Sequence, residues 1–135
     1  PWIVETSGGV DRTLFFVLMD AYEEEDLGDG NTRVVLKVNK DIAAYKAEIF
    51  PLVSNKEDIV KKARDVFNLL SEDIKVVWDD RGNIGKRYRY QDEIGTPYCI
   101  TIDYETLEND TVTVRDRDTM KQERVKIEDL DSVIN

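Results

Sequence analysis

The chain has 135 residues, of which 41% are hydrophobic, and its net charge at neutral pH is −10. This length and composition are typical of one folded domain of ordinary size and unlike those of a disordered tail. The absence of histidine and the single cysteine, Cys99, exclude a Ser-His-Asp or Cys-His mechanism, an internal disulfide and an imidazole zinc site, so we expect no metal site.

The first part of the chain predicts a short strand, a turn and a helix. Residues 2–4 are apolar and are followed by a Gly8-Gly9 turn. Residues 11–22 have the spacing of a helix that is buried on more than one side. The apolar residues that recur on one face of this helix are Leu14, Val17, Leu18 and Ala21. Residues 23–32 are acidic and contain glycine, which indicates a linker or an exposed hairpin.

The remainder of the chain alternates strands with helices. Ser54 and Glu57 have the spacing of a capping box before one helix, and Gly95 ends a second helix over 84–94. We expect a turn at 108–110, a hairpin at 116–121 and a short last helix over 128–134. The apolar face of the first of these helices is Ile59, Ala63, Val66, Phe67 and Leu70. The predicted strands are 34–38, 47–53, 74–78, 98–103, 111–115 and 123–127.

This order of elements predicts the fold class. From residue 47 onward the order is β-α-β-α-β-β-β-α. Two β-α-β units imply parallel strands with right-handed crossovers, and the short turns that follow imply antiparallel pairing. We therefore expect an α/β fold with a mixed five-stranded sheet flanked by helices.

One short run carries an excess of positive charge. Between Arg81 and Gln91 there are four basic residues and no acid, and Tyr88 and Tyr90 lie among them. Arginine and lysine bind phosphates and aromatic rings stack on unpaired bases, so the run has the composition of an RNA-binding surface. On composition alone, a solvated helix face is the simpler interpretation. The four basic residues are Arg81, Lys86, Arg87 and Arg89.

Four segments around this run resemble the anticodon-binding domain of glycyl-tRNA synthetases, which is shared among class IIa synthetases. They are GNIGKRY at 82–88, QDEIGTP at 91–97, ITID at 100–103 and TVTVRDRD at 111–118. AEIFPL at 47–52 is similar to the first strand of that domain. The resemblance implies that the chain recognises the anticodon stem-loop of tRNA-Gly. The residues that we expect to contact tRNA are Arg81, Lys86, Arg87, Tyr88 and Arg89.

The segment VETSGGVDR at 4–12 resembles motif 3 of class II synthetases, a strand followed by a helix with an arginine. In that family the arginine, here Arg12, contacts the phosphates of ATP, which binds with Mg²⁺. Glu5 and Ser7 occupy positions that bind glycine in glycyl enzymes, with Thr6 between them where the family commonly has proline. The ATP-binding residues implied by the resemblance are Gly9, Val10, Asp11 and Arg12.

The two resemblances together imply a division of the chain. Residues 1–32 are expected to be the end of a catalytic domain, and residues 33–135 an anticodon-binding domain. Because motifs 1 and 2 are absent from this sequence, it contains no catalytic residue of its own, and we expect the isolated chain to bind no ATP or glycine and to be inactive. The full enzyme is expected to be a homodimeric glycine-tRNA ligase.

Two further interpretations follow from the sequence. Processivity subunits of mitochondrial DNA polymerase reuse this domain without catalysis, so a non-enzymatic nucleic-acid-binding module is the alternative, and a protein-interaction domain with an acidic surface is a third option. The chain has no stretch of ~18–20 apolar residues and its first residues lack a basic lead. These features and the single cysteine predict a cytoplasmic protein without membrane contact.

Overall fold

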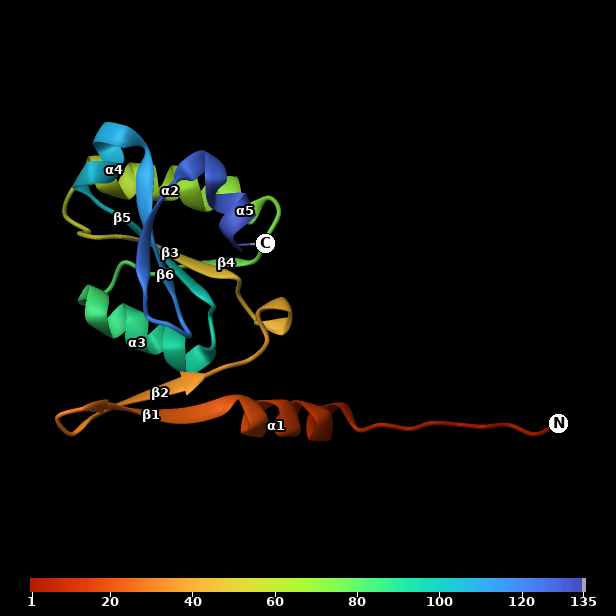
Figure 1. Cartoon of the computed structure of the whole chain (residues 1–135). Helices are drawn as coiled ribbons and strands as arrows, with labels where there is room; N and C mark the ends of the chain where they lie inside the picture. The colour runs from red at the N-terminus through yellow and green to blue at the C-terminus, as the bar shows by residue number, and fades with distance from the viewer. Residues whose placement is uncertain (135) are drawn as a thin grey trace.

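A computed structural model describes residues 1–134 (Figure 1). Its main body is a five-stranded sheet between two layers of helices. A helix, α1 (Val10–Ala21), and a two-stranded hairpin lie beside this body, next to helix α3 (Ile84–Ile94). The first nine residues have no regular secondary structure and extend away from the rest of the chain (Figure 1).

The sheet has the mixed topology that the order of elements predicts. The strands lie in the order β4-β3-β5-β6-β7, with β3 parallel to both of its neighbours and the remaining pairs antiparallel. The predicted mixed five-stranded sheet is confirmed. The strands are β3 (Ala47–Pro51), β4 (Val76–Trp78), β5 (Tyr98–Ile102), β6 (Thr111–Asp116) and β7 (Gln122–Lys126).

The two faces of the sheet differ in chemistry because side chains alternate along each strand. One face carries aliphatic residues such as Ile49 and Ile100 and packs on α2 (Glu57–Ser71) and α5 (Leu130–Ile134). The opposite face carries Glu48, Cys99 and Arg115, which are adjacent in register across β3, β5 and β6, and is covered by α3. The polar chemistry of the domain is therefore concentrated beneath α3.

Helix α2 forms where its apolar spacing predicts. Ile59, Ala63, Val66 and Leu70 are all buried, at intervals of three and four residues. The expected capping box is wrong: the helix starts at Glu57 after Lys56, and no side chain caps it, so Ser54 lies in a turn before the helix.

The acidic segment before the domain is a hairpin rather than a linker. Strands β1 (Tyr22–Gly28) and β2 (Asn31–Leu36) pair antiparallel, which confirms one of the two expectations for this segment. The expected domain boundary between residues 32 and 33 falls inside β2 and stays a prediction. A 3-10 turn, η1 (Lys40–Ile42), connects the hairpin to the sheet.

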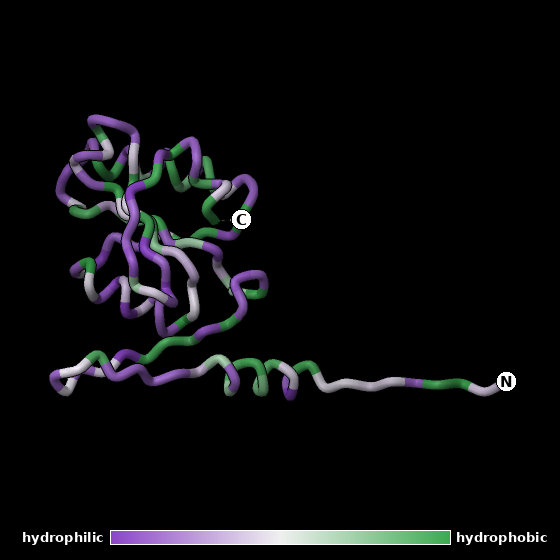
Figure 2. Tube along the Cα trace, in the orientation of Figure 1, coloured by the Kyte–Doolittle hydropathy of each residue, from purple (hydrophilic) through white to green (hydrophobic). Residues whose placement is uncertain are grey.

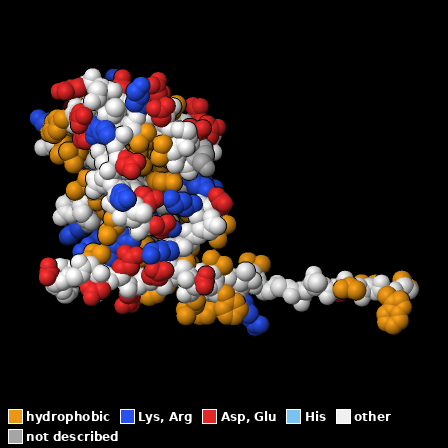
Figure 3. All heavy atoms as spheres, viewed as in Figure 1, with side chains coloured by type: hydrophobic (Ala, Val, Ile, Leu, Met, Phe, Trp, Pro, Cys, Tyr) orange, Lys and Arg blue, Asp and Glu red, His pale blue; other side chains and the backbone are white. Residues whose placement is uncertain are grey.

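Helix α1 forms as predicted but only one side of it is covered. Ala21 is buried, whereas Phe15 and Phe16 are 58% and 62% exposed. Figure 2 shows the contrast between hydrophobic α1 and hydrophilic β1, and Figure 3 shows hydrophobic side chains gathered on the outward side of α1. The expectation that this helix is buried on several sides is not met within residues 1–134.

Two other local predictions are wrong. Residues 2–4 form no strand, because no neighbouring strand in the described part of the chain offers them hydrogen bonds. The chain between β5 and β6 is a short helix, α4 (Tyr104–Asn109), followed by Asp110 in the left-handed conformation. Asp103 and Thr106 form a capping box at its start. The last turn and helix are η2 (Ile127–Asp129) and α5.

Candidate nucleic-acid interface

The loop that joins β4 to α3 carries the first of the expected RNA contacts. Its Asp79 Oδ1 accepts a hydrogen bond from the backbone N–H of Arg81 at 2.9 Å. Gly82 has a φ of +68°, which a residue without a Cβ adopts at little cost. The Asn83 side chain caps α3 by accepting from the backbone N–H of Lys86 at 2.9 Å. The loop is therefore an ordered turn at the carboxyl end of a parallel strand, where α/β sheets commonly bind ligands.

The buried side chain of Arg87 holds this loop in place through hydrogen bonds to its backbone. It is 3% exposed. Its Nε and Nη2 each donate to a carbonyl oxygen, those of Arg81 and Gly82, at 3.0 Å, and its Nη1 donates to the Pro51 carbonyl at 2.8 Å. This position does not favour the expected direct contact between Arg87 and RNA, because the side chain is buried and three of its N–H donors bind backbone carbonyls. Its role in the structure is to fix the loop against the end of β3.

The other basic residues of the run are exposed. Arg81 has 88% of its side chain accessible, and Lys86 and Arg89 lie on the exposed side of α3. Tyr90, which is 57% exposed, follows Lys86 by four residues and therefore shares its face of the helix. The edge formed by the exposed side of α3 and the loop before it therefore carries three cations and one aromatic ring, with Arg81 Nε 3.2 Å from Asp79 Oδ1.

Tyr88 faces the sheet more than the solvent. Its hydroxyl lies 2.9 Å from Thr101 Oγ1, and its ring packs edge-on against Phe50 with 5.5 Å between centroids. The guanidinium carbon of Arg115 lies 4.9 Å from the centroid of the same ring. Burial raises the pKa of the hydroxyl. Tyr88 is half-buried, so only part of its ring is left to meet a base.

A buried carboxyl group lies beneath this edge and was not among the expected site residues. Glu48 is fully buried at the centre of β3, where Gln91 Nε2 donates to its Oε1 at 3.0 Å, and Thr96 Oγ1 donates to Gln91 Oε1 at 2.5 Å. Burial raises the pKa of Glu48 to about 8, and the negative charge of Asp79 adds to the shift. The one signal in the sequence is an acid within an otherwise apolar strand.

The expected glycine and ATP contacts lie elsewhere. Glu5 and Ser7 are in the exposed N-terminal segment, and Arg12 is exposed on the first turn of α1. Gly9 precedes α1 and has no side chain to cap it, so N–H groups of the first turn remain free. Gly9 and Val10 line a groove between α1 and β2, whereas Glu5, Ser7 and Arg12 are not among the residues that line it.

An apolar groove of about 570 Å³ runs between α1 and β2. Its walls include Leu14 and Leu18 from α1 and Leu36 and Ile94 from the domain. Within residues 1–134, no group of three or more acidic or cysteine side chains is arranged to hold a metal ion, and no helix has the length and apolar character needed to cross a membrane.

Comparison with known proteins assigns the family. The sequence profile of the family described as "Anticodon binding domain" matches residues 46–135, which is most of the chain. The chain belongs to the anticodon binding domain family. This family assignment agrees with the five-stranded mixed sheet flanked by helices.

Curated relatives of this anticodon binding domain chain are glycine–tRNA ligases. The chain is 52% identical over 134 residues to that of Borreliella afzelii (strain PKo), and 53% and 48% identical to those of Clostridium kluyveri and Clostridium acetobutylicum. In each case the similarity covers 99% of this chain but only 28–30% of the relative. The chain therefore spans less than a third of the length of these relatives.

Proposed function

We propose that this chain is the part of a glycine–tRNA ligase that binds the anticodon stem-loop of tRNA-Gly. The observation that carries the proposal is the edge formed by Arg81, Lys86 and Arg89 on a chain whose net charge is −10. Cations gathered at one edge attract the phosphates of a single-stranded loop, even when the rest of the surface is acidic. Similarity to the ligases over 99% of the chain supports tRNA-Gly as the partner.

Each residue of this edge has a separate role in the proposal. Arg81, Lys86 and Arg89 contact phosphates, and Tyr90 offers a ring to an unpaired base. Tyr88 supports them through its bond to Thr101. Arg87 keeps the loop in its shape and acts on RNA only through it. Binding the anticodon end places the acceptor end of the tRNA in a distant active site, which converts binding energy into correct geometry.

The N-terminal residues serve the catalytic part of the full-length protein in this proposal. The free N–H groups of the first turn of α1 and the exposed Arg12 fit a phosphate group, so residues 9–12 would hold those of ATP, which binds with Mg²⁺. The carboxylate of Glu5 would meet the ammonium group of glycine, and Ser7 would line the same site. The exposed apolar residues of α1 are then covered by the rest of a cytoplasmic, homodimeric enzyme.

The binding proposal is tested by titration with the anticodon stem-loop of tRNA-Gly. We expect the triple variant with Arg81, Lys86 and Arg89 each replaced by glutamine to lose most of the affinity. A matched control, with exposed Lys61, Lys75 and Lys121 replaced by glutamine, removes the same charge elsewhere and should bind like the wild type. Equal loss in both variants would show that only net charge matters and would contradict the proposed edge.

A parallel titration with single-stranded DNA separates the alternative functions. Tight binding to single-stranded DNA of any sequence, without preference for the stem-loop, would favour a polymerase-accessory type of module.

The isolated chain is expected to show no glycine-dependent exchange of pyrophosphate into ATP, because Glu5, Ser7 and Arg12 are exposed without surrounding partners. Exchange above background would overturn this expectation.

A further inference from the structure

A buried network of ion pairs joins α3 to the β1–β2 hairpin, and the proposed RNA contacts do not use it. At its centre is Asp92, which is 1% exposed. Its two oxygens accept hydrogen bonds from Arg115 Nη1 and Nη2 at 2.8 and 3.0 Å. Arg33 of β2, itself 3% exposed, places its Nη1 3.4 Å from Asp92 Oδ2. One carboxylate therefore holds guanidinium groups from the sheet and from the hairpin.

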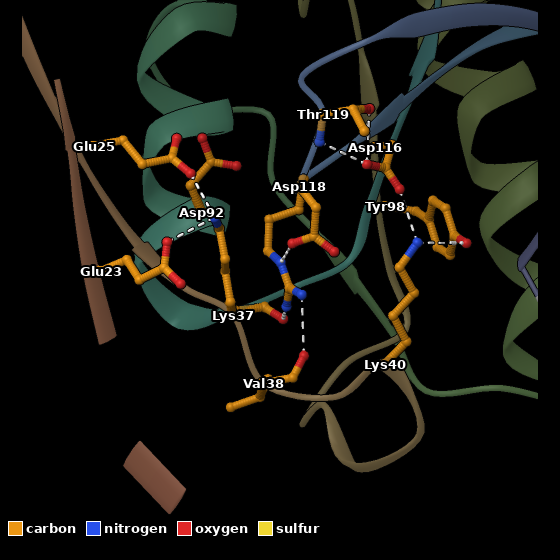
Figure 4. A network of polar contacts seen from close by, with 12 residues as sticks. Glu23, Glu25, Lys37, Val38, Lys40, Asp92, Tyr98, Asp116, Asp118 and Thr119 are labelled. Carbon is orange, nitrogen blue, oxygen red and sulfur yellow. Dashed lines mark hydrogen bonds and ion pairs between the residues drawn. The ribbon is translucent and has the colours of Figure 1, made fainter. Parts of the chain in front are cut away.

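Arg33 connects this centre to both strands of the hairpin and to the main body. Its Nη2 donates to the Arg117 carbonyl at 2.9 Å, and its Nε lies 3.0 Å from Glu25 Oε2 on β1. Lys37 pairs with the same Glu25 at 2.7 Å (Figure 4). Arg33 is thus close to a second carboxylate, Glu25, and Lys37 neutralises part of the charge of that carboxylate.

The end of α3 and the hairpin also meet through their backbones. Gly95 ends α3 with a φ of +84°, and a Cβ at this position would lie 2.8 Å from the Leu36 carbonyl oxygen. Arg117, which is 2% exposed, donates from Nη1 to the Gly95 carbonyl at 2.8 Å and from Nη2 to the Val38 carbonyl at 3.0 Å. The end of α3 is therefore in direct contact with β2, and Arg117 joins it to the segment that follows β2.

The network has one end at the RNA edge and the other at α1. Tyr88 precedes Asp92 by one helical turn, and Arg115 contacts both side chains. On the other side, β1 begins directly after α1, and the Ala21 carbonyl accepts a hydrogen bond from the backbone N–H of Lys37 at 2.6 Å. A continuous set of contacts therefore runs from the buried side of α3, the helix whose exposed side carries the proposed RNA contacts, to the helix that carries Arg12.

We propose that Arg33 and Asp92 are positioning residues that fix the orientation of the RNA-binding edge relative to α1. This inference rests on the proposed function. A buried ion pair contributes defined geometry more reliably than net stability, since its desolvation offsets much of its attraction. The pair thereby aligns tRNA bound at the anticodon edge with the catalytic part that contains α1, and neither residue touches tRNA.

The test uses the full-length protein with Arg33→Met. Asp92 keeps its two bonds from Arg115 in this variant, so no buried carboxylate is left unpaired. We expect stem-loop affinity and glycine-dependent ATP–pyrophosphate exchange to stay within about threefold of wild type, while kcat for aminoacylation of whole tRNA falls about tenfold or more, because small misplacements have large effects on rate. Arg33→Lys, which keeps the positive charge, should recover part of the loss.

Arg124→Met is the matched control, because Arg124 pairs with Asp103 and Glu105 and donates to Thr111 and Thr113 on β6. It should retain wild-type kcat. Unchanged aminoacylation by Arg33→Met, or a parallel fall of exchange and stem-loop binding, would overturn the positioning role. If the wild-type protein does not bind the stem-loop, the proposed function itself fails, and this result is distinguishable because it precedes any substitution.

Discussion

Glu48→Gln is expected to remove a pH dependence of stability that this one carboxyl group creates. In the folded state burial raises its pKa from the usual 4.5 to about 8. Between these two values the unfolded chain has released the proton and the folded chain retains it. Folding therefore takes up a proton, and the free energy of unfolding falls as the pH rises through this window.

The size of the effect follows from the shift. One pKa unit corresponds to about 1.4 kcal/mol, so the shift of Glu48 amounts to about 5 kcal/mol over the whole window. About 2 kcal/mol of this is lost between pH 6 and pH 8, where the slope begins to flatten. The neighbouring Cys99 thiol stays protonated in the folded state over this interval, because burial raises its pKa well above the ordinary value.

Urea unfolding at pH 6, 7 and 8 measures this difference for the wild type and Glu48→Gln. Because the chain has no histidine, few other groups can produce a slope here. The glutamine side chain can still accept the hydrogen bond that Gln91 donates to Glu48, so the variant should be nearly independent of pH and should gain about 2 kcal/mol on the wild type from pH 6 to pH 8. Parallel curves for the two proteins would refute the reasoning.

Two substitutions test the packing of α3 against the hairpin. Asp92→Ala leaves Arg115 buried without a counter-charge and leaves Arg33 with only Glu25, so it should destabilise the fold by about 3–5 kcal/mol in denaturant unfolding. The exposed Glu128→Ala should change little, and equal effects would contradict the buried pairing. Gly95→Ala, at φ +84° with its Cβ 2.8 Å from a carbonyl oxygen, should cost at least about 1–2 kcal/mol. Gly85→Ala, whose Cβ would make an ordinary contact 3.7 Å from Asn83 Oδ1, should be neutral or slightly stabilising.

The part of the fold that follows from periodicity was predictable. Helix α2 has Ile59, Ala63, Val66 and Leu70 at helical spacing, and these same residues are buried against the sheet. The order of strands and helices after residue 47 was sufficient to predict a mixed sheet. Helix α4 was not predicted because it is short. Its N-cap residue, Asp103, was assigned to the end of the preceding strand.

The sequence indicated the basic segment of the candidate RNA-binding site, but it did not distinguish the roles of the individual residues in that segment. Charge alone cannot distinguish exposed Arg89 from buried Arg87. Helical spacing could have done so, since Arg87 follows Ile84 by three residues and precedes Gln91 by four, which places it on the face that packs on the sheet. The pairing of Asp92 with Arg33 could not be predicted from the sequence. The two residues are 59 positions apart, and no spacing or motif near either one indicates its partner.

The most direct test of the proposed function compares two RNAs. The chain is titrated with the anticodon stem-loop of tRNA-Gly and with the same stem-loop carrying a changed anticodon, and the backbone amide signals of Arg81, Lys86 and Arg89 are followed by NMR. We expect saturable shifts at these residues, tighter binding of the unchanged stem-loop, and affinity that falls with added salt. Equal affinity for both RNAs, or no shifts along this edge, would contradict the assignment of anticodon recognition to this chain.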